Sequence, residues 1–297
     1  MRARVVEAMK RGGNIASETH GIDVSFQGEH GAYSELAAQF LFGESIQTKP
    51  CKTLKQVLRS VEDGSVEFGV LPAENSLEGS VNQTYDLLLQ TSLKICAEVK
   101  LRVSHCLLAL PGSELGDIRA VYSHPQALAQ CSAFLESLQV VGEPIYDIAG
   151  SAKLIREKNM RESAAIASER AAALYGLEIL RRGIEDFPEN LTRFLVISEN
   201  EAARTGRDKT SIVFGTKHSP GSLHRALSEL ATRGINLTKI ESRPIRGTPW
   251  EYHFFVDFEG HRTDPTCSDA LKALEKSTIF LKILGSYSSE GKLARDF

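Results

Sequence analysis

Residues 211–258 contain the sequence SIVFGTKHSPGSLHRALSELATRGINLTKIESRPIRGTPWEYHFFVDF. Its apolar positions follow a strand-like period, then a helical period, and then a strand-like period twice more. The elements predicted in this way are a strand at 211–215, a helix at 222–232 and strands at 237–243 and 252–258. A helix from about Ser268 and a strand at 280–284 follow. This βαββαβ order is the ferredoxin-like arrangement.

Upstream of this stretch, strands and helices alternate in two rounds. The first round comprises predicted strands at 24–26 and 68–71, helices at 36–42 and 53–61, and a helical face of Val81, Tyr85, Leu88 and Leu89. The second comprises strands at 121–122, 164–166 and 194–197, and helices at 128–138, 151–158 and 168–174. Such alternation is typical of parallel sheets covered by helices on both faces. We therefore expect two α/β lobes, with the β-rich stretch 94–110 and the chain near residue 190 crossing between them.

Composition along the chain indicates four parts. Residues 1–22 are polar and contain Gly-Gly-Asn, which indicates a short N-terminal extension. The two-lobed α/β domain is expected at 23–200, with its second lobe at about 101–189. Residues 201–209 are rich in charged and small side chains and are predicted to be a linker, so the ferredoxin-like domain is expected at 210–297.

The bulk composition excludes several classes of protein. The 297 residues are 42% hydrophobic and 25% charged, with a formal net charge of -3, as in ordinary globular domains. No basic run indicates nucleic-acid binding, and no apolar stretch approaches the ~20 residues of a membrane span. The first residues lack the apolar core of a signal peptide. We therefore expect a cytoplasmic protein with neither a nucleic-acid nor a membrane partner.

No residue pattern indicates a metal or an organic cofactor. The five cysteines are scattered without metal-ligand spacing, so reduced and buried thiols are expected. Gly28 and Gly31 do not form a GxGxxG motif. His105 and His124 fit hydrogen-bonded structural roles better than metal ligation, because no other ligand lies at a suitable spacing.

Small and polar residues occur at several predicted strand-to-helix turns. These turns lie at 28–34, 74–80, 123–126 and 149–152. In open α/β sheets, ligands bind beyond the carboxyl ends of the strands, where helix N-termini favour anions. If the two lobes face each other, the turns meet in one cleft that suits a small substrate with more than one carboxylate.

Each of these segments also has a structural interpretation. Residues 123–126 can simply begin a helix, with Ser123 as its cap and Pro125 in the first turn. Residues 74–76 can form a turn with an Asx hydrogen bond. Residues 192–194 can be an ordinary strand entry in which Arg193 forms a surface ion pair. Local sequence leaves these alternatives open.

Taken together, the motifs resemble those of the prephenate dehydratase family. They are, in order, Gly28-Glu-His-Gly31-Ala-Tyr33-Ser34-Glu35, Leu71-Pro-Ala-Glu74-Asn75-Ser76-Leu-Glu78-Gly79, Ser123-His124-Pro125-Gln126-Ala-Leu128 and Asn190-Leu-Thr192-Arg193-Phe194. The later Glu241-Ser242-Arg243-Pro244, with Phe254-Phe-Val-Asp257, resembles the ACT regulatory domain of that family. The resemblance covers residues 23–290. It implies an α/β fold with a two-lobed, periplasmic-binding-protein-like catalytic domain and a ferredoxin-like βαββαβ ACT domain.

Two features depart from the family pattern. The regulatory Gly-Ala-Leu-Val motif of the family stands here as Gly221-Ser222-Leu223-His224. Residues 1–22 are too short for the chorismate mutase that is fused to some relatives. We therefore expect a monofunctional enzyme, and the departure at His224 leaves the affinity for the effector open.

The resemblance implies a reaction and a set of catalytic residues. Family members convert prephenate to phenylpyruvate with loss of CO2 and water, without a cofactor. Thr192 is then the expected hydrogen-bond donor to the leaving hydroxyl, Arg193 a carboxylate clamp or an organiser of the cleft, and Phe194 part of its apolar wall. The substrate-binding residues implied are Glu74, Asn75 and Ser76 in the first lobe and Ser123 and Gln126 in the second. Ser34 is a weaker candidate at a matching turn.

The resembled ACT domain implies an effector and an assembly. It binds L-phenylalanine between two such domains, so a homodimer or homotetramer is expected. The implied effector-binding residues are Gly221, Ser222 and Leu223 for the carboxylate, Asn236 and Leu237 for the ammonium, and Glu241, Ser242 and Arg243 on the motif strand. An ion pair between Glu241 and Arg243 is an equally good interpretation of those two residues.

Two other functions remain open at this point. An arogenate dehydratase acts on the transaminated analogue, and the loop 147–152 is where that choice of substrate could be made. A non-catalytic amino-acid-binding sensor is a hypothesis of another class, because two α/β lobes around a cleft also describe solute-binding proteins.

Overall fold

A computed structural model describes residues 22–245, 247–248, 250–289 and 292–294, so the predicted extension before residue 22 lies outside the described residues. The described chain divides into two compact units. The two-lobed unit comprises 22–81, 99–194 and 292–294, and the C-terminal unit comprises 82–98 and 195–289.

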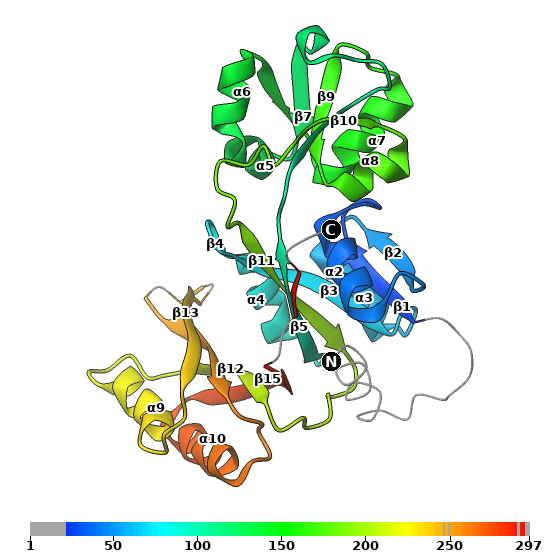
Figure 1. Ribbon diagram of the computed structural model, residues 1–297. Coiled ribbons are helices and arrows are strands. Elements are labelled where there is room, and N and C mark those ends of the chain that lie inside the picture. The colour runs from blue at the N-terminus through cyan, green and yellow to red at the C-terminus, as the bar shows by residue number, and fades with distance from the viewer. Residues whose placement is uncertain (1–21, 246, 249, 290–291, 295–297) are drawn as a thin grey trace. The chain divides into compact units, whose positions relative to one another are not determined.

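The first lobe is built on a seven-stranded sheet (Figure 1). The strands are β1 (Asp23–Gln27), β2 (Gln47–Cys51), β3 (Phe68–Asn75), β5 (Lys94–Arg102) and β11 (Leu191–Ser198), with the short β4 (Gly79–Ser80) and β16 (Lys292–Ala294). Their order is β16-β5-β11-β3-β1-β2, and β1 is parallel to both β2 and β3. Helices α2 (Tyr33–Phe42) and α3 (Leu54–Glu62) connect them, and a capping box between Thr53 and Gln56 begins α3.

The second lobe is a five-stranded sheet with helices on both faces (Figure 1). Its strands are β6 (Cys106–Ala109), β7 (Ala120–Ser123), β8 (Val141–Pro144), β9 (Ser163–Ala167) and β10 (Glu178–Arg182), in the order β10-β6-β9-β7-β8. Its helices are α5 (Pro125–Gln130), α6 (Ser132–Leu138), α7 (Ile148–Lys158), α8 (Glu169–Tyr175) and the short η1 (Leu115–Asp117). The central strand β9 is buried along its whole length. Its small alanine side chains allow the helices to approach it closely.

Several predictions for these lobes were wrong in detail. The second sheet is not wholly parallel, because β6 is antiparallel to both β9 and β10. The predicted helix 128–138 is two helices, separated at Cys131, whose φ of -118° and ψ of 23° are not helical. Strands β2, β8 and β10 were missed because each lies mostly exposed at a sheet edge and carries polar side chains, which removes the apolar pattern.

Two segments join the lobes, as predicted from the sequence. The outgoing segment 103–105 links β5 to β6, and the return segment 183–190 links β10 to β11. They hydrogen-bond to each other, since Val103 N donates to Asn190 O at 2.8 Å and Ile184 N donates to His105 O at 3.1 Å. The backbone therefore runs between the lobes as a paired two-stranded connection.

The C-terminal unit contains the ferredoxin-like fold that was predicted. Its elements are β12 (Asp208–Gly215), α9 (Ser222–Ala231), β13 (Leu237–Pro244), β14 (Tyr252–Glu259), α10 (Pro265–Ser277) and β15 (Phe280–Ser288). The antiparallel sheet has the order β13-β14-β12-β15, and α9 and α10 pack together on one face over a core that includes Phe214, Val256 and Phe258. Strand β12 begins within the predicted linker, where the Asp208 carboxylate accepts hydrogen bonds from the backbone of Thr205 and Gly206.

The opposite face of this sheet is covered by α4 (Asn82–Gln90), which the sequence pattern assigned to the first lobe. The ring of Tyr85 packs edge-on against Phe255 at a centroid distance of 5.1 Å. The Lys282 ammonium donates to the carbonyls of Leu88 (3.0 Å) and Leu89 (2.8 Å) and so satisfies the C-terminal end of α4. Burial lowers the pKa of Lys282.

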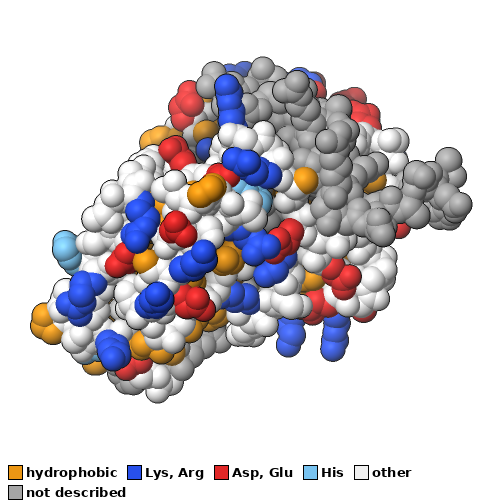
Figure 2. All heavy atoms as spheres, turned by 90° about the horizontal axis from the view of Figure 1, so that it is seen from below, with side chains coloured by type: hydrophobic (Ala, Val, Ile, Leu, Met, Phe, Trp, Pro, Cys, Tyr) orange, Lys and Arg blue, Asp and Glu red, His pale blue; other side chains and the backbone are white. Residues whose placement is uncertain are grey.

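The described surface carries both signs of charge. On the face shown in Figure 2, lysine and arginine side chains are interspersed with aspartate and glutamate. Within the described residues, no helix is long and apolar enough to span a membrane, and no cluster of three potential metal ligands occurs. The five cysteines are all free and buried.

Candidate active site

A cavity of about 250 Å³ lies between the two lobes, within the two-lobed unit. Three of the four strand-to-helix turns that the sequence singled out, at 28–34, 74–80 and 123–126, contribute to its lining, whereas the fourth, at 149–152, is represented, among the described residues, only by the preceding Asp147 and Ile148. The lining includes Tyr33 and Ser34 from the β1–α2 turn, Asn75 from the end of β3, His124 and Gln126 from the β7–α5 turn, and Thr192 and Phe194 from β11. The expected convergence of these turns is therefore seen in the structure.

Thr192 is held by Asn75. The Asn75 side-chain oxygen accepts hydrogen bonds from the backbone N–H groups of Leu77 (3.0 Å) and Glu78 (3.1 Å), which is the Asx turn considered for this segment. That arrangement directs the Asn75 amide nitrogen to Thr192 Oγ1, at 3.0 Å. Thr192 therefore accepts a hydrogen bond from the protein, and its own proton can be donated to a molecule in the cavity.

Arg193 lies on the other side of its strand. Successive side chains of a strand point to opposite faces. Thr192 and Phe194 accordingly line the cavity, and Arg193 is not among the described residues that line it. Arg193 is only 8% exposed, and its guanidinium lies 3.8 Å from a carboxylate oxygen of Glu74, which is also absent from the cavity lining. This placement is that of an organiser behind the cleft wall and not of a clamp that touches substrate.

Ser76 and Ser123 make backbone contacts outside the cavity lining. Ser76 Oγ accepts from Leu191 N at 2.9 Å and so ties the end of β3 to β11. Ser123 is fully buried and donates to the Ile166 carbonyl at 2.8 Å, which joins β7 to β9. The prediction that Ser123 caps α5 was wrong, because the cap is His124, whose Nδ1 accepts from Gln126 N at 3.2 Å.

Asp147 lines the cavity and was not predicted as a site residue. It caps α7 by accepting a hydrogen bond from Gly150 N at 2.6 Å, and burial raises the pKa of its carboxyl group. Gly28 approaches it so closely, at a φ of 114°, that a Cβ there would lie 2.8 Å from Asp147 Oδ2. The sequence singled out its loop, 147–152, for the choice of substrate but did not distinguish Asp147 within it, because the exposed strand β8 before the loop was missed.

The two lobes touch at Glu29, beside the cavity. Its carboxylate pairs with Lys153 at 2.9 Å and accepts from the Tyr146 hydroxyl at 3.1 Å. The hydrogen bond from Lys153 lowers the pKa of Glu29. Farther along, Ser168 and Tyr175 of the second lobe donate to the carbonyls of Gly31 (2.7 Å) and His30 (2.9 Å).

His105 is fully buried in the outgoing segment, in the structural role expected for it. Its Nε2 lies 3.0 Å from Gln130 Oε1 and its Nδ1 lies 3.1 Å from the Tyr33 hydroxyl. Burial lowers the pKa of His105 below its ordinary value of 6.5. The imidazole is therefore neutral in the folded protein at neutral pH.

We expect His105 to make folding sensitive to acid. The unfolded chain binds a proton at His105 near pH 6.5 and the folded chain does so only at lower pH, so the stability is lost as the pH falls from about 6.5 toward the lowered pKa. The slope from this one group cannot exceed about 1.4 kcal/mol per pH unit. Urea unfolding of the native protein and His105→Gln between pH 5 and 8 measures it. Parallel curves for the two proteins would contradict the prediction.

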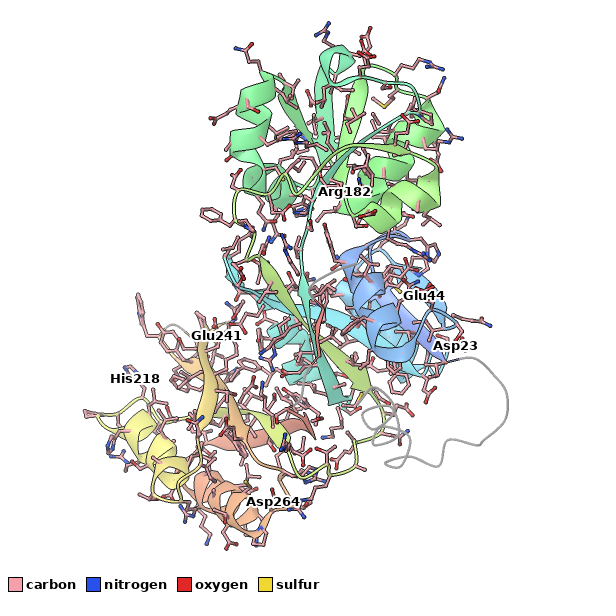
Figure 3. The ribbon with its side chains drawn as sticks, viewed as in Figure 1. Asp23, Glu44, Arg182, His218, Glu241 and Asp264 are labelled. Atoms are coloured by element: carbon pink, nitrogen blue, oxygen red, sulfur yellow. The ribbon has the colours of Figure 1, made fainter. Side chains whose placement is uncertain are left out.

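The predicted effector-binding residues do not meet in one chain. Ser222 and Leu223 line a hollow of about 170 Å³ next to Gly221, the N-cap residue of α9. Among the described residues that line this hollow, none of the other predicted effector-binding residues occurs. Of the others, Asn236 and Leu237 lie at the start of β13, and Glu241, Ser242 and Arg243 lie along it (Figure 3 labels Glu241). Arg243 pairs with Asp86 of α4 at 3.4 Å and Glu241 with Lys239 at 3.8 Å.

Comparison with known proteins identifies the family. The prephenate dehydratase family model matches residues 24–202, and the ACT domain model matches residues 210–276. The chain belongs to the prephenate dehydratase family.

Individual members of the family agree over most of the chain. The arogenate dehydratase/prephenate dehydratase 2 of Arabidopsis thaliana is 46% identical over 278 residues, which are 90% of this chain and 72% of that protein. The prephenate dehydratase of Arthrobacter aurescens, solved with L-Phe, matches with a TM-score of 0.82 at 34% identity, over 90% of each chain. A structure described as GqqA, a quorum quenching acylase, also matches with a TM-score of 0.82, at 39% identity, over 90% of this chain and 98% of that one.

Proposed function

We propose that the chain converts prephenate to phenylpyruvate, CO2 and water. In this reaction the bond between the ring and its carboxylate breaks, its electron pair completes the aromatic ring, and the ring hydroxyl leaves. The observation that carries the proposal is the placement of Thr192 in the cavity as a donor oriented by Asn75. A donor at the departing hydroxyl stabilises the charge that develops there.

The charge of the cavity suits loss of CO2. Among the described residues that line it there is neither lysine nor arginine, and Pro72, Val81, Val103 and Phe194 provide apolar walls. A cation held against the departing carboxylate would stabilise the substrate more than the transition state, in which that charge is lost. The lining therefore favours decarboxylation over retention of the ring carboxylate.

For the side-chain carboxylate of prephenate, we propose a place at the start of α2. The N-cap residue Ala32 provides no side-chain cap, and Ala32, Tyr33 and Ser34 all line the cavity. Uncapped N–H groups of a helix favour an anion. Binding there would orient the substrate without a cation near the bond that breaks.

The ACT domain makes L-phenylalanine the proposed effector. Feedback inhibition requires that L-phenylalanine bind the less active state more tightly than the active one. Because the predicted effector residues are separated in one chain, we propose that they meet between two copies, in a homodimer or homotetramer. A cytoplasmic location is the corresponding proposal for the cell.

An arogenate dehydratase activity is the second candidate, and Asp147 is the observation that favours testing it. Its carboxylate lines the cavity and could accept a hydrogen bond from the ammonium group that distinguishes arogenate from prephenate. Turnover of arogenate and turnover of prephenate should therefore be compared with the same protein.

The proposal is tested by measuring phenylpyruvate formation from prephenate at neutral pH, with and without L-phenylalanine. Turnover well above the enzyme-free rate, lowered by L-phenylalanine, is the expected result; the enzyme-free control matters because prephenate also loses CO2 and water spontaneously in acid. Phenylalanine formation from arogenate alone would replace prephenate by arogenate as the substrate. Absence of turnover with both substrates, together with binding of L-phenylalanine, would leave the sensor hypothesis.

A further inference from the structure

A chain of side-chain hydrogen bonds runs from the second lobe to Thr192. His105 Nε2 and Asn190 Nδ2 both lie 3.0 Å from Gln130 Oε1. The side-chain oxygen of Asn190 in turn accepts from Asn75 Nδ2 at 2.6 Å, and Asn75 Nδ2 also reaches Thr192 at 3.0 Å. We infer that Gln130 and Asn190 are positioning residues that orient Thr192 through Asn75, an inference that rests on the role proposed for Thr192.

The direction of each hydrogen bond in this chain is determined by its neighbours. The backbone donors of Leu77 and Glu78 occupy the Asn75 oxygen, so Asn75 must present its amide hydrogens to Asn190 and Thr192. Asn190 must then accept from Asn75 and donate to Gln130. A network in which every donor meets an acceptor holds its members in one orientation. Thr192 is left with its proton for the cavity.

The far end of the chain is equally constrained. The Gln130 amide nitrogen donates to Glu78 Oε1 at 2.8 Å, which directs the Gln130 oxygen to Asn190 and His105. That oxygen accepts two hydrogen bonds, so neutral His105 carries its proton on Nε2. The Tyr33 hydroxyl donates its one proton to the Ser104 carbonyl at 2.5 Å and lies 3.1 Å from His105 Nδ1.

The chain joins the two lobes. Gln130 belongs to α5 of the second lobe, Asn75 to β3 of the first, and Asn190 to the return segment between them. The hydrogen bonds from Gln130 to Glu78 and Asn190 therefore exist only when the lobes are placed as in this structure. The second lobe is therefore linked to Thr192 through Gln130, Asn190 and Asn75.

Burial indicates that Asn190 is costly to disturb. It is fully buried, and Asn75 is 5% exposed. Loss of the Asn190 oxygen would leave the amide hydrogen of Asn75 that it accepts with only the distant Leu191 carbonyl, at 3.4 Å, and the Asn75 amide would then turn or recruit water. Either change moves the group that holds Thr192, whose hydroxyl acts only as the bond to the leaving group breaks, so the larger effect is expected on kcat. Asn75 and Gln130 also line the cavity, so a smaller change in KM is expected with it.

The test is a double-mutant cycle between Gln130→Met and Thr192→Val in the full-length chain, with prephenate as substrate. Gln130→Met alone is expected to lower kcat about 10- to 100-fold and to change KM less than about threefold. In the Thr192→Val background it should lower kcat less than about twofold further, because the oriented hydroxyl is already gone. A loss of equal size in both backgrounds would overturn the inference, because it would show a structural role that does not act through Thr192.

Ser132→Ala is the matched control. Ser132 Oγ donates to Asp186 in the same return segment at 2.9 Å, but does not join the chain to Thr192. It should keep kcat within about twofold of the native value. A loss in Ser132→Ala as large as that in Gln130→Met would assign the effect to the attachment of the return segment and overturn the inference.

A readout without turnover separates this inference from the proposed function. In the native protein, the side-chain amide protons of Asn75 and Asn190 should exchange slowly in NMR spectra, and Gln130→Met should accelerate their exchange. That result would support the hydrogen-bond chain even if native protein failed to convert prephenate, which would refute the proposed function alone. Unchanged exchange in Gln130→Met would overturn the chain, whatever the activity.

Discussion

Thr192→Val is expected to lower kcat for prephenate by about 10²–10³, which corresponds to about 3–4 kcal/mol of transition-state stabilisation. Valine keeps the branched shape of threonine and removes the hydroxyl that Asn75 directs toward the cavity. Because the hydroxyl donates to a group that gains charge only as it leaves, KM should change much less than kcat. Steady-state kinetics at neutral pH measures both constants.

Thr192→Ser is the matched control for that experiment. Serine keeps a hydroxyl that can accept from Asn75, so most of the activity should return. Thermal denaturation of each variant distinguishes a lost donor from a damaged fold, since the valine also leaves the Asn75 amide without one acceptor, at a cost of about 1–3 kcal/mol. If Thr192→Val turned over prephenate at the native rate, Thr192 would have no part in the chemistry.

Lys209→Met is expected to lower the free energy of unfolding by about 3–5 kcal/mol. Lys209 and Glu98 are 9% and 3% exposed, and the ammonium lies 2.9 Å and 3.2 Å from the two carboxylate oxygens. They join β12 to the first part of β5, residues 94–98, which belongs to the C-terminal unit. The methionine side chain fills a similar volume but deprives the buried carboxylate of this cation. Urea unfolding followed by circular dichroism measures the change.

Two further variants test the cause of that loss. The double variant Glu98→Gln/Lys209→Met should be more stable than Lys209→Met, because it no longer buries the carboxylate charge. Lys272→Met removes a cation from an exposed pair with Asp269, whose side chains are 70% and 68% exposed, and should change stability by less than about 1 kcal/mol. Equal losses in Lys209→Met and Lys272→Met would show that burial of the pair has no energetic consequence.

The strength of the apolar pattern explains which elements were predicted. The buried strands β1, β3, β9 and β12 and the amphipathic helices carry regular apolar positions, so their order and the ferredoxin-like fold followed from the sequence. The edge strands β2, β8 and β10 obtain their hydrogen bonds from one neighbour and expose polar side chains, so no apolar period marks them. The helix α4 has the expected pattern, but only its packing on Phe255 shows which unit it joins.

The family, the order of the elements and the motifs from which Asn75, Gln126 and Thr192 enter the cavity were evident from the residues alone. The position of Arg193 and Ser123 outside the cavity lining, and of Asp147 and His124 within it, became evident only from the folded chain. The same is true of the hydrogen bonds that join Gln130 to Asn190 across 60 positions and Asn75 to Thr192 across 117. A motif specifies residue types along the chain. The face of a strand that meets the cavity, and the partner that each polar group finds, depend on how distant segments pack.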